Sequence, residues 1–300
     1  MDKKIIARPL IDQHLDSYKG FFDHEWSRRI FEAVRTSSLE DPVWELMLAW
    51  RSANGVHLLP WLMVESLRKF ATGEIEGSLQ YRASYAEEVI KGVVNKIAEA
   101  MHYSLTQEQR SNLKRVVTKI EKEAAGTIKT AKEQVAFDVE RYWASLLPLS
   151  EFQFSILGTQ RTNYGSLFFA YEDFLANVIR TKEPTYSSKK KPIKETFAVH
   201  FGESLTDFCW NHDEVNLARL VRNALAHNGS RFGRDLEKYK ARFVDATHMD
   251  KALLRGDRFN LVDGIIQITP DNTAYLFSVL KERVTQIVEE LVQSGLSPEV

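Results

Sequence analysis

Apolar residues recur at intervals of three and four along most of the 300-residue chain, and this is the spacing of one face of an α-helix. One segment differs, because Phe259 to Ile268 carries Asp263-Gly264 at its centre, which predicts a β-hairpin. We therefore expect a mostly α fold with one small β-hairpin. The predicted helices cover residues 25–34, 42–50, 55–70, 74–103, 106–147, 163–180, 212–228 and 270–292.

The longest periodic stretch, residues 74–147, predicts a long antiparallel helical hairpin. Thr106 and Gln109 form a capping-box pattern at the start of its second helix, and the apolar residues after them repeat with spacings of 4, 3 and 4. This eleven-residue repeat is typical of a nearly straight helix. Basic residues along that helix alternate with glutamates, so an ordinary solvated face is favoured over a membrane-binding or nucleic-acid-binding helix.

Pro148 ends the hairpin and predicts a domain boundary. We expect a helical N-terminal region over residues 1–148 and a second helical domain, which holds the β-hairpin, over residues 149–295. The N-terminal region also contains a cluster of tryptophans at helical spacing. Such residues form a hydrophobic core more often than a ligand cage. They are Trp26, Trp44, Trp50 and Trp61.

The composition narrows the possible functions. The formal net charge is −1, so any binding of nucleic acid depends on a local basic patch. The single cysteine, Cys209, excludes a disulfide framework and is predicted to be buried between Phe208 and Trp210. The longest apolar run, Leu58 to Val64, is too short to cross a bilayer, and the N-terminus lacks the apolar stretch of a signal peptide. We expect a cytoplasmic protein with no membrane association, no cofactor and no bound metal.

The segment 212–228 predicts a helix whose beginning and end are both marked in the sequence. Asn211 followed by Glu214 three residues later is a capping-box pattern, and Asn228-Gly229 is typical of a helix C-terminus. His227 therefore lies at the end of a rigid element, next to a loop. The apolar stripe that faces a core consists of Leu217, Leu220, Val221, Ala224 and Leu225.

Three polar residues in the last turns of this helix carry candidate chemistry. Arg222 is a permanent cation whose donors suit phosphate, and His227 exchanges a proton near neutral pH. Asn223 lies four residues before His227, where it can orient the imidazole. Arg222 lies about 140° around the helix from His227. Either the long arginine reaches round, or a second copy of the helix across a two-fold axis completes the site. The small residues Ala218 and Ala226 beside Arg222 would admit that copy.

The pattern Arg222-Asn223-x-x-x-His227, late in a helix of an all-helical domain, resembles the R-x(4–6)-H signature of HEPN-domain proteins. The resemblance covers roughly residues 150–295. The same spacing of arginine and histidine also occurs at Arg8 and His14, Arg51 and His57, and Arg242 and His248. Among these four arginines, only Arg222 is followed directly by asparagine and lies in a predicted helix with an apolar stripe and a marked end.

Many HEPN-domain proteins are metal-independent ribonucleases of toxin–antitoxin and phage-defence systems, and the resemblance implies such a function here. It implies that His227 acts as general base or acid at a ribose 2′-hydroxyl and that Arg222 stabilises charge on the phosphate. Asn223 would then fix the imidazole or touch phosphate. The resemblance also implies an RNA substrate and a homodimer with an active cleft on its two-fold axis. It leaves room for an antitoxin or another regulatory protein as partner.

Two further features bear on substrate binding. Glu172, on the helix 163–180, is either a partner for the arginine or histidine, as acidic side chains on this helix are in some HEPN proteins, or a carboxylate at the rim of the core. Residues 180–194 hold six basic residues and one acidic residue. Lys189, Lys190 and Lys191 are the centre of this loop. Basic side chains that meet phosphates strengthen binding without reading sequence, although a mobile, solvated connector has the same composition.

Other interpretations stay open at this point. The HEPN family contains members that cut nothing, so the chain could be a HEPN-like module that binds RNA, nucleotide or a protein partner. A helical scaffold whose long hairpin is the working part is a third interpretation. The arginine and histidine of the motif would then be a solvated cation and a helix cap.

Overall fold

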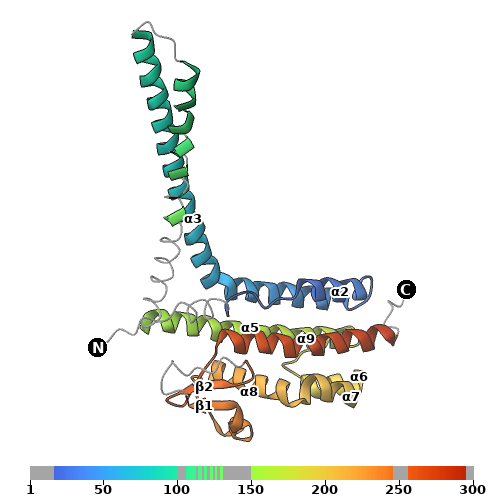
Figure 1. Cartoon of the computed structure of the whole chain (residues 1–300). Helices are drawn as coiled ribbons and strands as arrows, with labels where there is room; N and C mark the ends of the chain where they lie inside the picture. Colours follow the sequence, from blue (N-terminus) through green and yellow to red (C-terminus); the bar gives the residue numbers. More distant parts are fainter. Residues whose placement is uncertain are drawn as a thin grey trace. The chain divides into compact units, whose positions relative to one another are not determined.

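The computed structural model describes residues 17–100, 106–112, short stretches between 114 and 130, 150–245 and 256–294. Within these residues the fold is mostly helical, as predicted, with one small sheet (Figure 1). The elements in chain order are α2 (His24–Val34), α3 (Glu40–Ala100), α5 (Ser150–Arg180), α6 (Ile193–Phe201), α7 (Glu203–Thr206), the π-helical turn η1 (Asp207–Asn211), α8 (Asp213–His227), the 3₁₀-helix η2 (Arg234–Arg242), β1 (Phe243–Asp245), β2 (Phe259–Val262), β3 (Ile265–Gln267) and α9 (Pro270–Gln293).

Contacts within the chain define two units. The first consists of Met1–Gln13 and Pro60–Leu149, and the second of His14–Leu59 and Ser150–Val300. The division near residue 149 lies next to Pro148, where the sequence predicts a boundary. Residues 14–59 belong with the C-terminal half of the chain, although the sequence predicts them to be part of the N-terminal region.

Aromatic packing explains why the N-terminal helices join the second unit. The rings of Trp26 on α2 and Trp50 on α3 stack with centroids 6.0 Å apart. Both meet the ring of Phe277 on α9 edge-on, at 6.1 and 5.2 Å, and the Trp26 indole donates to Thr285 Oγ1 at 2.8 Å. Trp26 and Trp50 are thus core residues, as predicted, whereas the Trp44 side chain is 46% exposed.

Helix α3 is longer than the sequence predicts. The expected breaks near Gly55 and near residue 72 are absent, and one helix runs from Glu40 to Ala100 with Pro60 inside it. An interior glycine costs only about 1 kcal/mol and an interior proline about 3 kcal/mol. These costs are small compared with the free energy gained when whole turns pack into a core, since the part of α3 before Pro60 buries Leu46, Trp50 and Ala53.

The second helix of the predicted hairpin begins at the predicted capping box. The Thr106 N–H donates to Gln109 Oε1 at 2.8 Å, and the Gln109 N–H donates to Thr106 Oγ1 at 3.3 Å. Residues 107–112 are helical. The turn at 101–105 and the end of the helix at 131–147 lie outside the described residues, so the hairpin as a whole stays a prediction.

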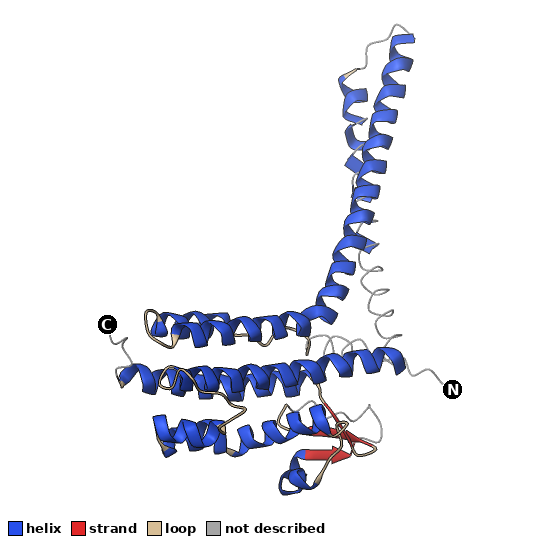
Figure 2. Cartoon of the chain, turned by 180° about the vertical axis from the view of Figure 1, so that it is seen from behind, coloured by secondary structure: helices blue, strands red, loops and turns tan. Residues whose placement is uncertain are grey.

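The second unit is built in layers (Figure 2). Helix α2 and the first turns of α3 form one layer, α5 and α9 form the middle layer, and α6, α7, η1 and α8 lie on the other side together with the sheet. The middle layer supplies much of the core, and α8 packs against it. The predicted inward stripe of α5 is buried, and it consists of Tyr164, Leu167, Phe168, Tyr171, Phe174, Leu175 and Val178.

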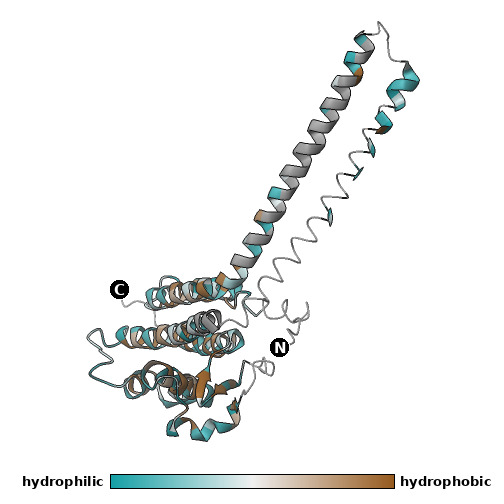
Figure 3. Cartoon of the chain, turned by 90° about the vertical axis from the view of Figure 1, so that its left-hand side faces the viewer, coloured by the Kyte–Doolittle hydropathy of each residue, from teal (hydrophilic) through white to brown (hydrophobic). Residues whose placement is uncertain are grey.

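The sheet has the strand order β1-β2-β3. Strands β2 and β3 pair antiparallel with Val262 opposite Ile265, which confirms the predicted hairpin. Asp263 and Gly264 both have positive φ, 51° and 74°, as the tight hairpin turn favoured by this residue pair requires. Strand β1 pairs with β2 in parallel, a pairing that the sequence pattern does not reveal. The strands are among the more hydrophobic segments of the second unit (Figure 3).

Helix α9 begins and ends close to its predicted bounds. Thr269 caps it through a reciprocal pair: the Asn272 N–H donates to Thr269 Oγ1 at 3.2 Å, and the Thr269 N–H donates to Asn272 Oδ1 at 2.9 Å. Pro270 takes the first helical position, where its missing N–H costs nothing. In the part of the chain that the structure describes, no helix is both long and apolar enough to cross a membrane.

Candidate functional site

Helix α8 carries the candidate residues, and its N-cap is not the predicted one. Asn211 is the last residue of η1, and its side-chain amide donates to Asp207 Oδ1 at 2.6 Å. His212 is the N-cap instead, with φ −54° and ψ 138°, and its Nδ1 accepts the Glu214 N–H at 3.3 Å. The predicted capping box of Asn211 and Glu214 is therefore wrong, because the wider π turn carries Asn211 into the preceding helical segment.

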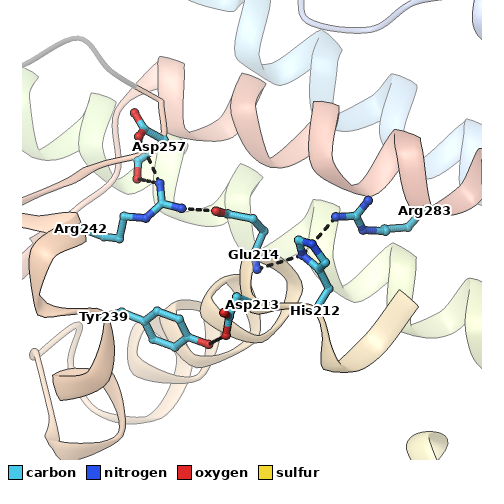
Figure 4. A network of polar contacts seen from close by, with 7 residues as sticks. All are labelled: His212, Asp213, Glu214, Tyr239, Arg242, Asp257 and Arg283. Carbon is cyan, nitrogen blue, oxygen red and sulfur yellow. Dashed lines mark hydrogen bonds and ion pairs between the residues drawn. The ribbon is translucent and has the colours of Figure 1, made fainter. Parts of the chain in front are cut away.

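A network of polar side chains holds the beginning of α8 (Figure 4). Arg242, the last residue of η2, donates to the Glu214 carboxylate and, through its other terminal nitrogen, to Asp257 Oδ2 at 3.1 Å. The three side chains are 30%, 19% and 26% exposed, in that order. Charge-assisted bonds in such partly buried places are stronger than those on an open surface. The network therefore ties the first turn of α8 to η2 and to the segment before β2.

A second part of this network comes from α9 and from η2. Arg283 is 3% exposed, and it donates to His212 Nδ1 at 3.1 Å while its guanidinium lies over the Phe208 ring at 4.1 Å. On the other side of the helix, the Tyr239 hydroxyl donates to Asp213 Oδ1 at 3.1 Å. The partners are 71 and 26 positions apart in sequence, so no local pattern could have indicated them.

The end of α8 is fixed mainly through its backbone. The chain leaves the helix through Gly229, whose φ of 60° confirms the predicted stop, and the Ser230 N–H donates to the Ala224 carbonyl at 2.9 Å. Arg161 of α5 donates to the Leu225 carbonyl. A cation at this position interacts favourably with the negative end of the helix dipole. No pattern in the sequence indicates this contact of Arg161 with the end of α8.

Arg222 points toward α5 and is largely enclosed. Only 9% of the residue is exposed. Its guanidinium forms an ion pair with Glu172 and lies over the rings of Phe169 at 4.5 Å and Phe168 at 5.4 Å. Ala218, one turn earlier on the same side of α8, is buried as well. The expectation that Ala218 offers surface to a second copy is therefore wrong, because this side of the helix packs inside its own unit.

Glu172, the acidic residue predicted to be near the site, lies directly against Arg222. Its side chain is 18% exposed, so it is both a partner of the arginine and a carboxylate near the rim. Burial raises the pKa of Glu172, and the guanidinium groups of Arg222 and Arg219 oppose that shift without offsetting it. The contact is thus a partly buried ion pair whose carboxylate bears a desolvation penalty.

His227 lies on the exposed side of the helix end. Ala226, His227 and Asn228 are all exposed, and Asn223 is half-buried. Among the described residues, neither Asn223 nor His227 has a side-chain hydrogen bond or ion pair. Asn223 therefore does not hold the imidazole within one chain. Arg222 and His227 face different sides of α8, as their separation of about 140° predicts.

A cleft of about 600 Å³ opens beside Arg222. Side chains from α5, η1, α6 and α8, together with the loop between α5 and α6, form its walls. Phe169, which is 48% exposed, belongs to this lining, whereas His227 does not. The charged lining residues are balanced, so the cleft itself is not a basic surface. The basic residues are Lys194, Arg219 and Arg222, and the acidic residues are Glu172, Asp173 and Glu195.

The predicted basic loop connects α5 to α6 and is organised around Tyr186. Tyr186 is 4% exposed, and its hydroxyl donates to the Lys191 carbonyl at 3.1 Å. The Lys191 ammonium group forms an ion pair with Glu183 at 2.6 Å. Lys189 and Lys190 are exposed and have no ion pair with a described residue. Two of the three predicted lysines are therefore open to a ligand.

Other chemical groups in the chain offer less. Within the described residues, no three histidine, cysteine, aspartate or glutamate side chains are grouped so as to hold a metal ion. Cys209 is fully buried, as predicted, and burial raises the pKa of its thiol to about 12. A thiol in such a place is not a nucleophile near neutral pH.

Comparison of the chain with models of known protein families, with curated proteins and with solved structures finds no match. The candidate site therefore depends on the geometry of α8 and its surroundings and on the HEPN-like pattern in the last turns of that helix.

Proposed function

We propose that this protein is a metal-independent endoribonuclease of the HEPN type. The observation that carries the proposal is His227, which is exposed and has no partner among the described residues, at the end of a helix that is held firmly elsewhere. Five residues earlier, the same helix carries Arg222, which lines a cleft. Cleavage of RNA through its own 2′-hydroxyl needs a proton-transfer group and a cation for the phosphate, and these two residues supply them.

In the proposed reaction, the His227 imidazole removes the proton from a ribose 2′-hydroxyl, and the 2′-oxygen attacks the adjacent phosphorus. The bond from phosphorus to the 5′-oxygen breaks, and that oxygen takes up a proton from an imidazolium. The products are a 2′,3′-cyclic phosphate and a 5′-hydroxyl. Arg222 stabilises the charge on the phosphate oxygens, and Asn223 contacts the imidazole or the phosphate. General acid–base catalysis of this kind contributes about 10²–10⁴-fold.

The proposed active cleft lies between two copies of the chain. Within one copy, Arg222 faces α5 and His227 faces away, so a single phosphate does not readily meet both side chains. A second copy across a two-fold axis would bring the two α8 ends together, and the exposed Ala226 beside His227 leaves room for close approach. Phe169, half-exposed beside Arg222, offers a ring on which a base can stack.

The proposal is tested with labelled single-stranded RNA and pure protein in excess EDTA. We expect cleavage, with products that end in 2′,3′-cyclic phosphate and 5′-hydroxyl. A single 2′-deoxy substitution at the cleaved position should abolish the cut and leave binding intact. Cleavage that survives the 2′-deoxy substitution, or that appears only with added divalent metal, would exclude this mechanism.

A second candidate function is that of a non-catalytic HEPN-like module that binds RNA, nucleotide or a protein partner. The ion pair between Arg222 and Glu172 favours it, because a guanidinium already held by a carboxylate is less available to charge that develops in a reaction. Tight binding of RNA by pure protein without any cleavage would support this function. Arg222 would then be a phosphate clamp.

A cellular role follows if cleavage is observed. The HEPN resemblance suggests a toxin or an effector of phage defence, kept inactive by an antitoxin or another regulatory protein. Induced expression should then arrest growth for the wild type and not for His227→Ala at equal protein level. Equal arrest by both would separate the cellular effect from the proposed chemistry.

A further inference from the structure

An apolar groove lies between α2 and the first turns of α3, outside the Arg222 cleft. The two helices run antiparallel (Figure 1), and each presents residues spaced i, i+3, i+4 and i+7 to a hollow of about 210 Å³. This spacing is one face of an α-helix, so the groove is the seam between two regular helical faces. Its lining is His24, Ser27, Arg28 and Phe31 on α2, and Trp44, Met47, Leu48 and Arg51 on α3.

The floor of this groove is apolar and open to solvent. The rings of Phe31 and Trp44 lie 5.5 Å apart, and Trp44 and Leu48 are 46% and 45% exposed. Adjacent side chains of α3 that face the other way, such as Trp50, are buried. This part of the helix therefore has one face packed in the core and one apolar face exposed to solvent. Contiguous exposed apolar surface, above all where polar residues rim it, is typical of an interaction site.

The rim of the groove is basic. Arg28, Arg51 and His24 contribute to the lining, and no acidic side chain does. Among the described residues, the guanidinium groups of Arg28 and Arg51 have no hydrogen bond or ion pair. The groove therefore combines apolar anchoring positions with cations that form no ion pair with a described residue.

We propose that this groove binds an acidic amphipathic helix of another protein. A groove between two antiparallel helices fits the apolar face of a third helix, and the two rim arginines, Arg28 and Arg51, favour a partner with carboxylates beside that face. A second copy of this chain fits less well, because two-fold pairing of the same groove brings Arg28 and Arg51 toward their own counterparts. The inference is independent of the proposed ribonuclease chemistry.

The experiment uses the full chain and two fluorescein-labelled helical peptides. One carries leucines at i, i+3, i+4 and i+7 flanked by glutamates, and the other has every glutamate replaced by lysine. Fluorescence anisotropy should show that the glutamate peptide binds at least about tenfold more tightly, which corresponds to about 1.4 kcal/mol. This preference should shrink as salt screens the charges. Equal affinity for the two peptides would overturn the proposal.

Matched variants locate the binding. Arg28→Glu/Arg51→Glu should abolish the preference for the glutamate peptide, and Leu48→Asp should weaken binding of that peptide. Arg29→Glu is the control, since Arg29 is exposed next to Arg28 but does not line the groove. If Arg29→Glu lost as much affinity for the glutamate peptide as Arg28→Glu alone, that result would contradict the assignment of binding to this groove. So would a wild-type dimer that Leu48→Asp converts to monomer, because a second copy would then occupy the groove.

Discussion

The two ends of α8 differ in how their polar side chains are used. At the beginning, His212 and Glu214 are each held by an arginine from another element. At the end, His227 is exposed and without a partner among the described residues. The charges of the first turn fix the helix in the unit, whereas the last turn leaves a titratable group open to solvent. A rigid element that carries one free functional group is the arrangement that precise positioning requires.

Arg222 lies between these two situations. Its guanidinium lines the cleft but is enclosed by Glu172 and Phe169. It therefore contributes to both the stability and the proposed chemistry, so a change at this residue alone does not separate the two. Changes at the two ends of α8 do allow that separation.

The largest combined effect is expected for Arg222→Ala. The cleavage rate should fall by about 10²–10³-fold, as for other groups that stabilise developing charge. The free energy of unfolding should also fall by about 1–3 kcal/mol, because the partly buried carboxylate of Glu172 loses its partner. Cleavage assays and urea denaturation measure the two effects. Arg219→Ala is the control, since Arg219 lines the same cleft and donates to Asn216 rather than to an acid. An unchanged cleavage rate for Arg222→Ala would remove this residue from the mechanism.

The anchored end should respond in stability alone. Arg242→Met keeps the side-chain stem and removes the bonds to Glu214 and Asp257, so we expect the free energy of unfolding to fall by about 1–3 kcal/mol. The cleavage rate per folded molecule should stay at the wild-type value. Denaturation and cleavage of the same preparation test this. A large loss of cleavage with the fold intact would erase the proposed difference between the two ends.

The pH dependence of stability sharpens the description of the Arg222 side. Burial raises the pKa of Glu172 above its value in the unfolded chain, so the folded protein holds this proton more tightly than the unfolded chain does. The stability that this difference gives is fully present below the ordinary carboxyl pKa. That stability is lost as pH rises through the raised pKa. Glu172→Gln lacks this proton, so its stability relative to wild type should increase from acidic pH toward neutrality. Urea denaturation across that range measures the trend. A decrease instead would mean that the ion pair with Arg222 outweighs the burial.

The smallest effect is expected in the basic loop. Lys191 is already paired with Glu183, so among the three central lysines Lys189 and Lys190 are the two that form no ion pair with a described residue. Replacing these two by glutamine should reduce the slope of log affinity against log salt by about 1.4 for single-stranded RNA. Lys191→Gln, the control, should change that slope less. Equal slopes for all three proteins would leave the loop as a connector between α5 and α6.

Features fixed by neighbouring residues were predictable from the sequence. The Asp263-Gly264 turn, the Thr106 capping box and the buried stripe of α5 all depend on residues within one turn or one helix face. The Gly229 stop after His227 belongs to the same class. Local pattern therefore indicated most of the elements and the position of the candidate histidine.

Features that depend on distant partners were not predictable. The π turn before α8 moved the cap from Asn211 to His212. The contact of Arg242 with Glu214 joins residues 28 positions apart. The enclosure of Arg222 likewise depends on α5, which lies 50 positions earlier at Glu172. Packing between elements, rather than periodicity within them, decides whether such side chains are structural or free.

The central claim is tested most directly by the two histidines at the ends of α8. His227→Ala should reduce cleavage by about 10²–10⁴-fold and should change the free energy of unfolding by less than about 0.5 kcal/mol. His212→Ala removes the N-cap and the acceptor for Arg283, so it should cost about 0.5–2 kcal/mol of stability and leave the cleavage rate per folded molecule unchanged. Cleavage that survives His227→Ala but is lost with His212→Ala would contradict the account.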